Sequence, residues 1–441
     1  MLTRTWLILL VFASVAARGQ AGSGAEPPLA NEDARMATPA AVNVEGSSLA
    51  YSTEMERSNY LRGGIAFISA YDSDVYSAAD GSAVGDESYS IWPSIALDQA
   101  TSRLRWGVAY NPGFTFYQHT SVRNESDQRL GANFTYRLSP HVTMTLADGF
   151  TRTSNILNQA NLEPPVSIGG LLQSPNPGVI APIADVLSNT GSAQISYQFS
   201  TNDMVGASGT FTELRYPNQA QAGGLFGASA RGGQAFYTRR ISQRHYFGAT
   251  YQYQMLLTDP SEVNAKVQSV ALFYTIMLKP SLSVSFFGGP QHSDVYGTGL
   301  VEQRMWSPEA GGGLGWQGKQ TSVNVAAARR ISDGGGLVGP VRSYSGSLAV
   351  RHQLFPHLTV SAVGAYSDSN VLDALPTFTS GGHTISGSIS AQRQWGQHFS
   401  TDLAYMRLHQ NYGGLLAGAI APDRNRVWVT LSYQFERAIG R

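Results

Sequence analysis

The chain ends in a segment of regular alternation, Arg426-Val427-Trp428-Val429-Thr430-Leu431-Ser432-Tyr433-Gln434-Phe435. Its odd-numbered positions are all apolar or aromatic, and its even-numbered positions are mostly polar. A period of two residues is typical of a β-strand whose two faces meet different surroundings. We therefore predict a closing strand over 426–435 that has one apolar face.

The same alternation recurs upstream, for example over 105–116, 129–138 and 247–255. Short links rich in Ser, Pro and His alternate with longer segments rich in Gly, Ser, Asp and Asn. One unit of strand, short turn, strand and long loop therefore repeats along the chain. Counting these units predicts an all-β, antiparallel up-and-down barrel of about 18 strands, or about 16 if the weak segments near Pro93 and 231–241 are not strands.

The composition places this barrel in a membrane. Charged residues make up 14% of the 441 positions, whereas a soluble protein carries roughly 25%. The polar faces of the predicted strands hold Ser, Thr, Gln and Asn in place of the charges that a soluble surface needs. Aromatic residues gather at the turn ends, as in the girdles of transmembrane barrels. These are Tyr197, Phe199, Trp316, Phe355, Trp395, Phe399, Tyr433 and Phe435.

The N-terminus predicts export. Residues 1–21 contain Arg4, an apolar run over 6–12 and small residues after it, as in a signal peptide that is cleaved. The apolar run is too short to span a bilayer as a helix, and no later segment is long enough. We expect a largely disordered periplasmic segment over 22–60, the barrel over 61–435 and a short periplasmic tail over 436–441.

From residue 63 to 435 the chain resembles bacterial outer-membrane β-barrel proteins, and porins in particular. This resemblance implies the outer membrane of a Gram-negative cell envelope, contact with its lipid, and insertion by the barrel-assembly machinery. The closing strand is similar to the signal that this machinery reads, which implies that role for Val427, Val429, Leu431, Tyr433 and Phe435. Family members usually stop at the aromatic residue, whereas this chain continues for six residues. A homotrimer is left open.

The longest connection, from about 154 to 188, is the third long loop. It is apolar and poor in charge, and long loops in compact structures usually have a function. In general porins the third loop narrows the pore, so the resemblance implies an inward-folded constriction; an external contact loop is the alternative. The candidate constriction residues are Glu163, Leu171, Leu172, Asn176, Ile180 and Asp185.

Alternation also predicts which charged side chains face the lumen. They are Arg105, Arg129, Arg137, Glu309, Arg351, Asp402 and Arg426. These charges either neutralise one another or give a mildly cationic pore. The rest of the predicted lumen is hydroxyl and amide, which suits small neutral polar solutes such as sugars.

No catalytic, cofactor or metal site is expected. The segment 313–320 is similar to a phosphate-binding loop but ends in Gln320 where Ser or Thr is required. Four histidines lie at separate short turns, too far apart around a barrel rim to share a metal. The absence of Cys excludes disulfides. The 30 basic residues are matched by 30 acidic ones, so no nucleic-acid footprint exists.

The sequence therefore predicts a porin-like channel for passive diffusion of small polar solutes rather than an enzyme. Two alternatives stay open. One is a barrel component for the export or attachment of a surface polysaccharide. The other is a plugged barrel with a structural or adhesive role.

Overall fold

The computed structural model describes residues 59–77, 83–120, 124–153, 185–218, 225–259, 263–297, 302–372, 381–413 and 423–439. The predicted signal peptide and most of the expected periplasmic segment lie outside these residues. The described residues form eighteen β-strands. They are β1 (Asn59–Ser77), β2 (Ala83–Ala100), β3 (Leu104–Tyr117), β4 (Glu125–Arg137), β5 (Val142–Thr153), β6 (Val186–Gln198), β7 (Asp203–Arg215), β8 (Gly227–Ser242), β9 (His245–Asp259), β10 (Asn264–Lys279), β11 (Leu282–Tyr296), β12 (Gln303–Gln317), β13 (Thr321–Ser332), β14 (Val341–Phe355), β15 (Leu358–Val371), β16 (Gly381–Trp395), β17 (Phe399–Gly413) and β18 (Asp423–Ala438).

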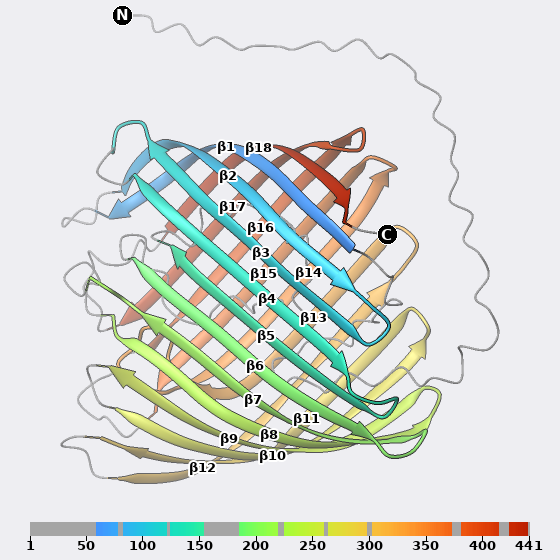
Figure 1. Ribbon diagram of the computed structural model, residues 1–441. Coiled ribbons are helices and arrows are strands. Elements are labelled where there is room, and N and C mark those ends of the chain that lie inside the picture. Colours follow the sequence, from blue (N-terminus) through green and yellow to red (C-terminus); the bar gives the residue numbers. More distant parts are fainter. Residues whose placement is uncertain are drawn as a thin grey trace, which may run out of the picture. The chain divides into compact units, whose positions relative to one another are not determined.

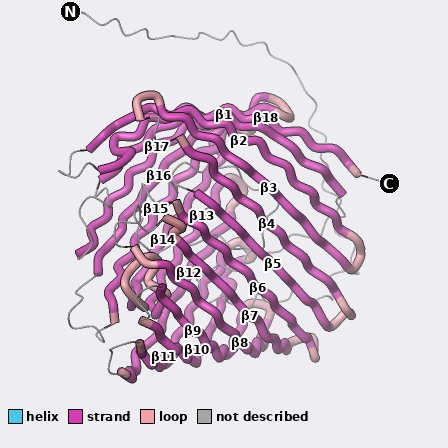
Figure 2. The backbone as a smooth tube through the Cα atoms, turned by 60° about the vertical axis from the view of Figure 1, so that its left-hand side comes forward, coloured by secondary structure: helices cyan, strands magenta, loops and turns pink. Residues whose placement is uncertain are grey.

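The strands make one closed antiparallel barrel. Each pairs with its neighbours in sequence, and β1 also pairs with β18. Figures 1 and 2 show the tilted strands following one another around the wall, with β1 beside β18. The predicted barrel of 18 strands is confirmed. The lower count of 16 is wrong, because Pro93 lies inside β2 and 231–241 lies inside β8.

Pro93 interrupts only one side of its strand. β2 pairs with β1 without a break through this position, but its ladder with β3 skips from Ile91 to Ile95. A proline has no N–H to donate, and Pro112 on β3 lies within the same skipped stretch. The pairing with β1 therefore keeps β2 in the wall.

The ends of the barrel extend slightly beyond the predicted limits. β1 begins at Asn59, and Tyr60 pairs with Ala438, three residues past Phe435. Arg62 and Glu436 form an ion pair across this seam, with 3.1 Å between Nε and Oε1. Part of the predicted tail therefore continues the last strand.

The two faces of the wall differ as the alternation predicts. On β18 the exposed apolar side chains of Val427, Val429, Leu431, Tyr433 and Phe435 all lie on the outer face. Their neighbours from Arg426 to Ser432 are buried on the inner face. The aromatic residues at the turn ends are exposed, with Phe355 at 65% and Trp395 at 45%. Among the residues described, no helix is long and apolar enough to cross a membrane.

Candidate functional site: the barrel interior

The inner wall is lined by hydroxyl groups that connect neighbouring strands. Ser90 Oγ and Thr115 Oγ1 lie 2.8 Å apart between β2 and β3, and Ser400 Oγ and Ser432 Oγ lie 2.6 Å apart between β17 and β18. Each group can donate one hydrogen bond and accept others, so the pairs keep capacity for a further partner. A polar solute inside the barrel would meet such groups.

The predicted lumen charges all lie on inner-face positions by the register of their strands. Arg105 is on β3, Arg129 and Arg137 on β4, Glu309 on β12, Arg351 on β14, Asp402 on β17 and Arg426 on β18. The structure does not gather them at one point, because these strands are spread around the wall. They line the interior at separate places.

Inward-facing acids accompany several of the arginines. Arg105 Nη2 lies 3.5 Å from Asp98 Oδ2, and Asp98 is 3% exposed. Arg424 forms a buried ion pair with Asp72. These acids were not predicted from the sequence. The register of the β2–β3 hairpin nevertheless places Asp98 on the inner face, diagonally across from Arg105, which pairs with Ala100. Strand-by-strand pairing of each hairpin would have found this partner.

Two tryptophans also lie on the inner wall. Trp92 on β2 and Trp428 on β18 flank β1, and they are 3% and 7% exposed. Together with Ile68 they belong to one buried apolar cluster, and Arg426 lies over the ring of Trp428 at 5.7 Å. Neither tryptophan stands out in the sequence, although both occupy positions on the inner face of their strands.

The segment 333–340, between β13 and β14, contributes to a cluster that crosses the interior. Leu337 from this segment is fully buried. Its cluster holds Val186 of β6 and Leu214 of β7 together with Val341 of β14 and Tyr412 of β17. β6 and β7 pair with each other, but neither is a neighbour of β14 or of β17, so side chains from the two sides can meet only across the inside of the barrel. The segment therefore narrows the lumen. The narrowing lies near the end of the barrel at which the long loops connect the strands.

Backbone hydrogen bonds fix this segment. Phe226 N donates to Gly336 O at 3.0 Å, and Leu372 N donates to Pro340 O at 3.2 Å. Gly336 has a φ of 105°, and a Cβ at this position would lie 2.8 Å from Tyr216 Oη. Only glycine accepts both this backbone conformation and this close approach. The segment is thus attached to the start of β8 as well as to the strands beside it.

Tyr216, which this loop covers, lies just beyond the end of β7. Burial raises the pKa of its phenol, and the carboxylate of Asp333 raises it further. The hydroxyl therefore stays neutral at physiological pH. The contact under Gly336 is between neutral groups and does not respond to moderate changes in pH.

A second apolar cluster continues this layer. It joins Leu256 and Val263 near the β9–β10 connection to Ile331 of β13 and Leu372 after β15. Val371 packs against both clusters, so the two form one continuous layer. The constriction predicted from the sequence lies in another loop, 154–188, because a Gly-rich segment without regular alternation gives no signal for this position.

Most of the predicted constriction loop, including Glu163, Leu171, Leu172, Asn176 and Ile180, lies outside the described residues. Asp185 is described, and its Oδ2 lies 3.6 Å from Arg152 Nη2. This ion pair joins the start of β6 to the end of β5 at the rim. It places Asp185 at the base of the loop.

The residues described hold no group of three or more His, Cys, Asp or Glu placed to bind a metal ion. His352 Nδ1 lies 2.7 Å from Thr321 Oγ1 between neighbouring strands. His292 lies 3.6 Å from Asp294, and its ring is 4.7 Å from that of Trp306. These contacts join residues of the wall to one another.

No protein-family model matches the chain, and no curated protein matches its sequence. Solved structures do resemble its fold. OpdK of Pseudomonas aeruginosa, crystallised with vanillate, is 8% identical, with a TM-score of 0.42 over 86% of this chain and 99% of that chain. OccAB4 of Acinetobacter baumannii is 9% identical, with a TM-score of 0.44 over 87% and 100% of the two chains. OprD of Pseudomonas aeruginosa is 12% identical, with a TM-score of 0.42 over 86% and 96%.

Proposed function

We propose that this protein is a porin-like channel of the bacterial outer membrane, through which small polar solutes diffuse passively. The observation that carries the proposal is the difference between the two faces of the closed wall. The outer face presents apolar and aromatic side chains, and the inner face presents hydroxyl, amide and paired charged groups. Such a wall separates lipid from a water-filled interior.

The narrowest section in this proposal is the apolar layer around Leu337. A solute must pass beside the 333–340 segment, so its size and its cost of desolvation decide its rate. The hydroxyl groups and paired charges along the rest of the wall replace part of the lost hydration. Passage needs no catalytic residue and no cofactor.

The proposal includes the parts of the chain that act before the channel forms. Residues 1–21 direct export and are removed, and the closing strand is read by the barrel-assembly machinery. The outward side chains from Val427 to Phe435 are exposed and free for such a contact. Trimer formation is not needed for passage through one barrel.

Single-channel recording in planar bilayers tests this function. The proposal expects discrete conductance steps from the purified protein. Deletion of 160–183 tests the predicted constriction loop separately, because removal of an obstruction raises the conductance. A protein that gives no steps, either intact or with each loop shortened, would instead be a plugged barrel.

A further inference from the structure

Cations gather on one arc of the barrel rim that carries the short turns. Arg244 lies in the turn between β8 and β9, Lys279 ends β10 just before the next turn, and Lys319 lies in the turn between β12 and β13. These three turns follow one another around the wall. Neighbouring turns are two strands apart, which is roughly 10 Å. The three cations therefore form one row, which we call the basic rim.

The acids of these hairpins lie further up the strands, away from the basic rim. The described residues 240–258, 264–293 and 310–332 contain no Asp or Glu. Asp203, on the adjacent hairpin, already accepts a hydrogen bond from Tyr237 Oη at 2.6 Å. The three cations are exposed, and among the described residues none of their side chains has an ion pair or a hydrogen bond. The rim therefore presents three positive charges that the protein leaves uncompensated.

Backbone hydrogen bonds fix the spacing of these charges. Met277 N on β10 donates to Arg244 O at 2.8 Å, and Gln317 N on β12 donates to Ser281 O at 2.8 Å. Each turn is thus attached to the next hairpin as well as closing its own. The basic rim is carried by a connected edge of the barrel.

Exposed apolar side chains lie beside the cations. Leu278 immediately precedes Lys279 and is 48% exposed. Trp316 lies three residues before Lys319 and is 39% exposed, and a Cβ at Gly318 would lie 3.2 Å from its indole. The indole therefore lies against the turn that carries Lys319. The charges and the apolar surface that contacts lipid meet along this edge.

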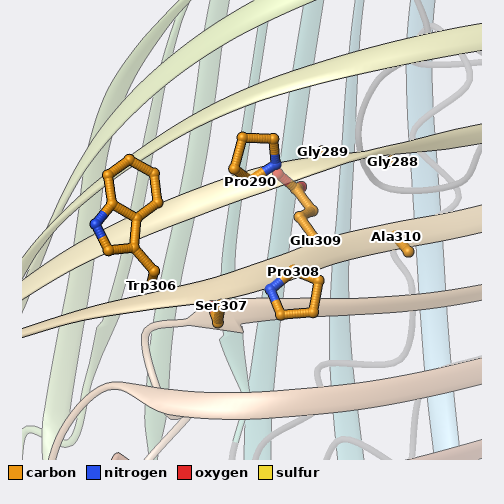
Figure 3. A pocket seen from close by; sticks show the side chains of 8 residues that line it. All are labelled: Gly288, Gly289, Pro290, Trp306, Ser307, Pro308, Glu309 and Ala310. Carbon is orange, nitrogen blue, oxygen red and sulfur yellow. The ribbon is translucent and has the colours of Figure 1, made fainter.

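The basic rim lies at the level of one membrane interface. Trp306 and Trp316 are both exposed on the outer face of β12, and ten residues of a tilted strand rise by roughly 25 Å, the height of the apolar band. The outward residues between them carry no charge, and Figure 3 shows Pro290 and Pro308 beside Trp306. The two tryptophans thus mark the two interfaces. Short turns of outer-membrane barrels are periplasmic, so the rim beyond Trp316 meets the headgroups of the periplasmic leaflet.

Anionic phospholipid headgroups supply the charge that this rim lacks. Phosphate oxygens accept charge-assisted hydrogen bonds from guanidinium and ammonium groups. Lys and Arg side chains near a membrane surface are attracted to lipids of net negative charge. A zwitterionic head brings its own cation and compensates the rim less well. A soluble acidic protein would have no use for the apolar side chains that lie beside the cations, whereas a phospholipid uses both.

We propose that the basic rim binds the headgroups of anionic phospholipids in the periplasmic leaflet. The phosphates lie at Arg244, Lys279 and Lys319, and the acyl chains lie on the adjoining outer faces of β9, β10 and β12. The site holds this side of the barrel at a fixed level in the membrane and gathers anionic lipid around it. It acts on the outside of the barrel and does not depend on the passage of solutes through the lumen.

Lipid selectivity at the rim tests this site. The chain contains no Cys, so Ser281→Cys gives a single labelling position in the turn after Lys279. A bimane fluorophore at this position is measured in mixed vesicles of phosphatidylcholine and phosphatidylglycerol, with one or the other brominated near the headgroup to quench on contact. We expect a preference for phosphatidylglycerol of at least about fivefold. This preference should fall towards one at about 1 M salt.

Two triple variants of equal charge separate the rim from general electrostatics. Arg244→Gln/Lys279→Gln/Lys319→Gln should abolish the preference. The matched control removes three exposed arginines at the other rim and should keep it; these changes are Arg215→Gln, Arg304→Gln and Arg407→Gln. Heat-modifiable mobility on gels confirms that both variants are folded.

Three results would overturn the site. The first is equal quenching by the two lipids in the unaltered protein, and the second is a preference that survives the triple substitution of the rim. The third is loss of the preference on adding inorganic phosphate at constant ionic strength, which would indicate a site for the free anion. Both triple variants should pass uncharged sugars like the unaltered protein, so failure of the site and failure of the channel are distinguishable.

Discussion

Arg424 Nε on β18 donates hydrogen bonds to both carboxylate oxygens of Asp72 on β1, at 2.8 Å each. The two side chains are 1% and 2% exposed. They lie at opposite ends of the sequence, and their contact joins the last strand to the first. The barrel is therefore closed by a buried ion pair as well as by its backbone ladder.

Removal of one partner of this ion pair should strongly lower the free energy of unfolding. Arg424→Leu removes the guanidinium that donates hydrogen bonds to both oxygens of the buried Asp72 carboxylate, and Arg426, its cross-strand neighbour, is the cation that remains. The free energy of unfolding should fall by up to about 3–5 kcal/mol. Urea unfolding in lipid vesicles, followed by heat-modifiable mobility on gels, measures this loss. The double variant Asp72→Asn/Arg424→Leu should recover part of it, since the carboxylate that loses its hydrogen-bonded guanidinium is removed as well.

The chain provides its own control for this seam. Arg62 and Glu436 also join β1 to β18, but their side chains are 31% and 47% exposed. An exposed pair typically contributes at most about 1 kcal/mol. Arg62→Gln should therefore change the free energy of unfolding far less than Arg424→Leu. Equal losses at the two positions would contradict a special role for the buried pair.

Gly336 should control the aperture. Gly336→Ala places a Cβ against Tyr216 in a backbone conformation that alanine rarely adopts, so the 333–340 segment must move. The expected result is a larger or more variable single-channel conductance. Gly396→Ala is the matched control, because Gly396 has a φ of 86° but open space around its Cα. Its conductance should equal that of the unaltered protein.

The rim contact of Asp86 should be lost in acid. Asp86 lies beyond the outward-facing Tyr89, outside the membrane. Burial raises its pKa, but hydrogen bonds from the side chains and backbone N–H groups of Thr120 and His119 outweigh this, and its pKa falls from 3.8 to about 2. A lowered pKa in the folded state adds stability above pH 3.8, and this stability disappears as the pH falls through about 2.

Asp86→Asn should remove that pH dependence. The free energy of unfolding of the unaltered protein should fall by about 1–2 kcal/mol between pH 5 and 2, and the variant should lack this component. Asp259→Asn, at an exposed rim position on β9, is the control and should retain it. A variant that matches the unaltered protein across this range would refute the assignment.

Arg351 should influence ion selectivity. It is exposed on the inner face of β14, where its guanidinium adds positive potential to the lumen. Arg351→Glu should raise the permeability of K⁺ relative to Cl⁻ by about twofold. Arg393→Glu alters the outer face of β16, beside Trp395, and should leave the reversal potential unchanged. A reversal potential that does not respond to Arg351→Glu would place this residue away from the ion path.

The strands could be predicted from the sequence because each has one face in lipid and one face inside. Val427, Leu431 and Tyr433 illustrate this regularity, and the short links rich in Ser, Pro and His mark where paired strands turn. Pro93 shows where local propensity misleads, since a proline weakens one ladder while the other ladder holds the strand in place. The pairing of β2 with β1 keeps Pro93 within a strand despite its low strand propensity.

The interior could not be predicted in the same way. Leu337 meets Val186 and Tyr412 only because strands far apart in the wall face each other across the lumen. No local pattern encodes that meeting, and the Gly-rich 333–340 segment carries no alternation. Asp98 and Arg105, in contrast, are close in sequence, and their pairing follows from the register of one hairpin.

Liposome swelling tests the central claim most directly. Vesicles that contain the purified protein are exposed to a series of uncharged sugars of increasing size. A porin-like channel narrowed by the 333–340 segment predicts rapid swelling with the smallest sugars and a steep decline with size, which shifts to larger sugars in Gly336→Ala but not in Gly396→Ala. Vesicles that do not swell with any sugar, for the unaltered protein and for both variants, would contradict a diffusion channel.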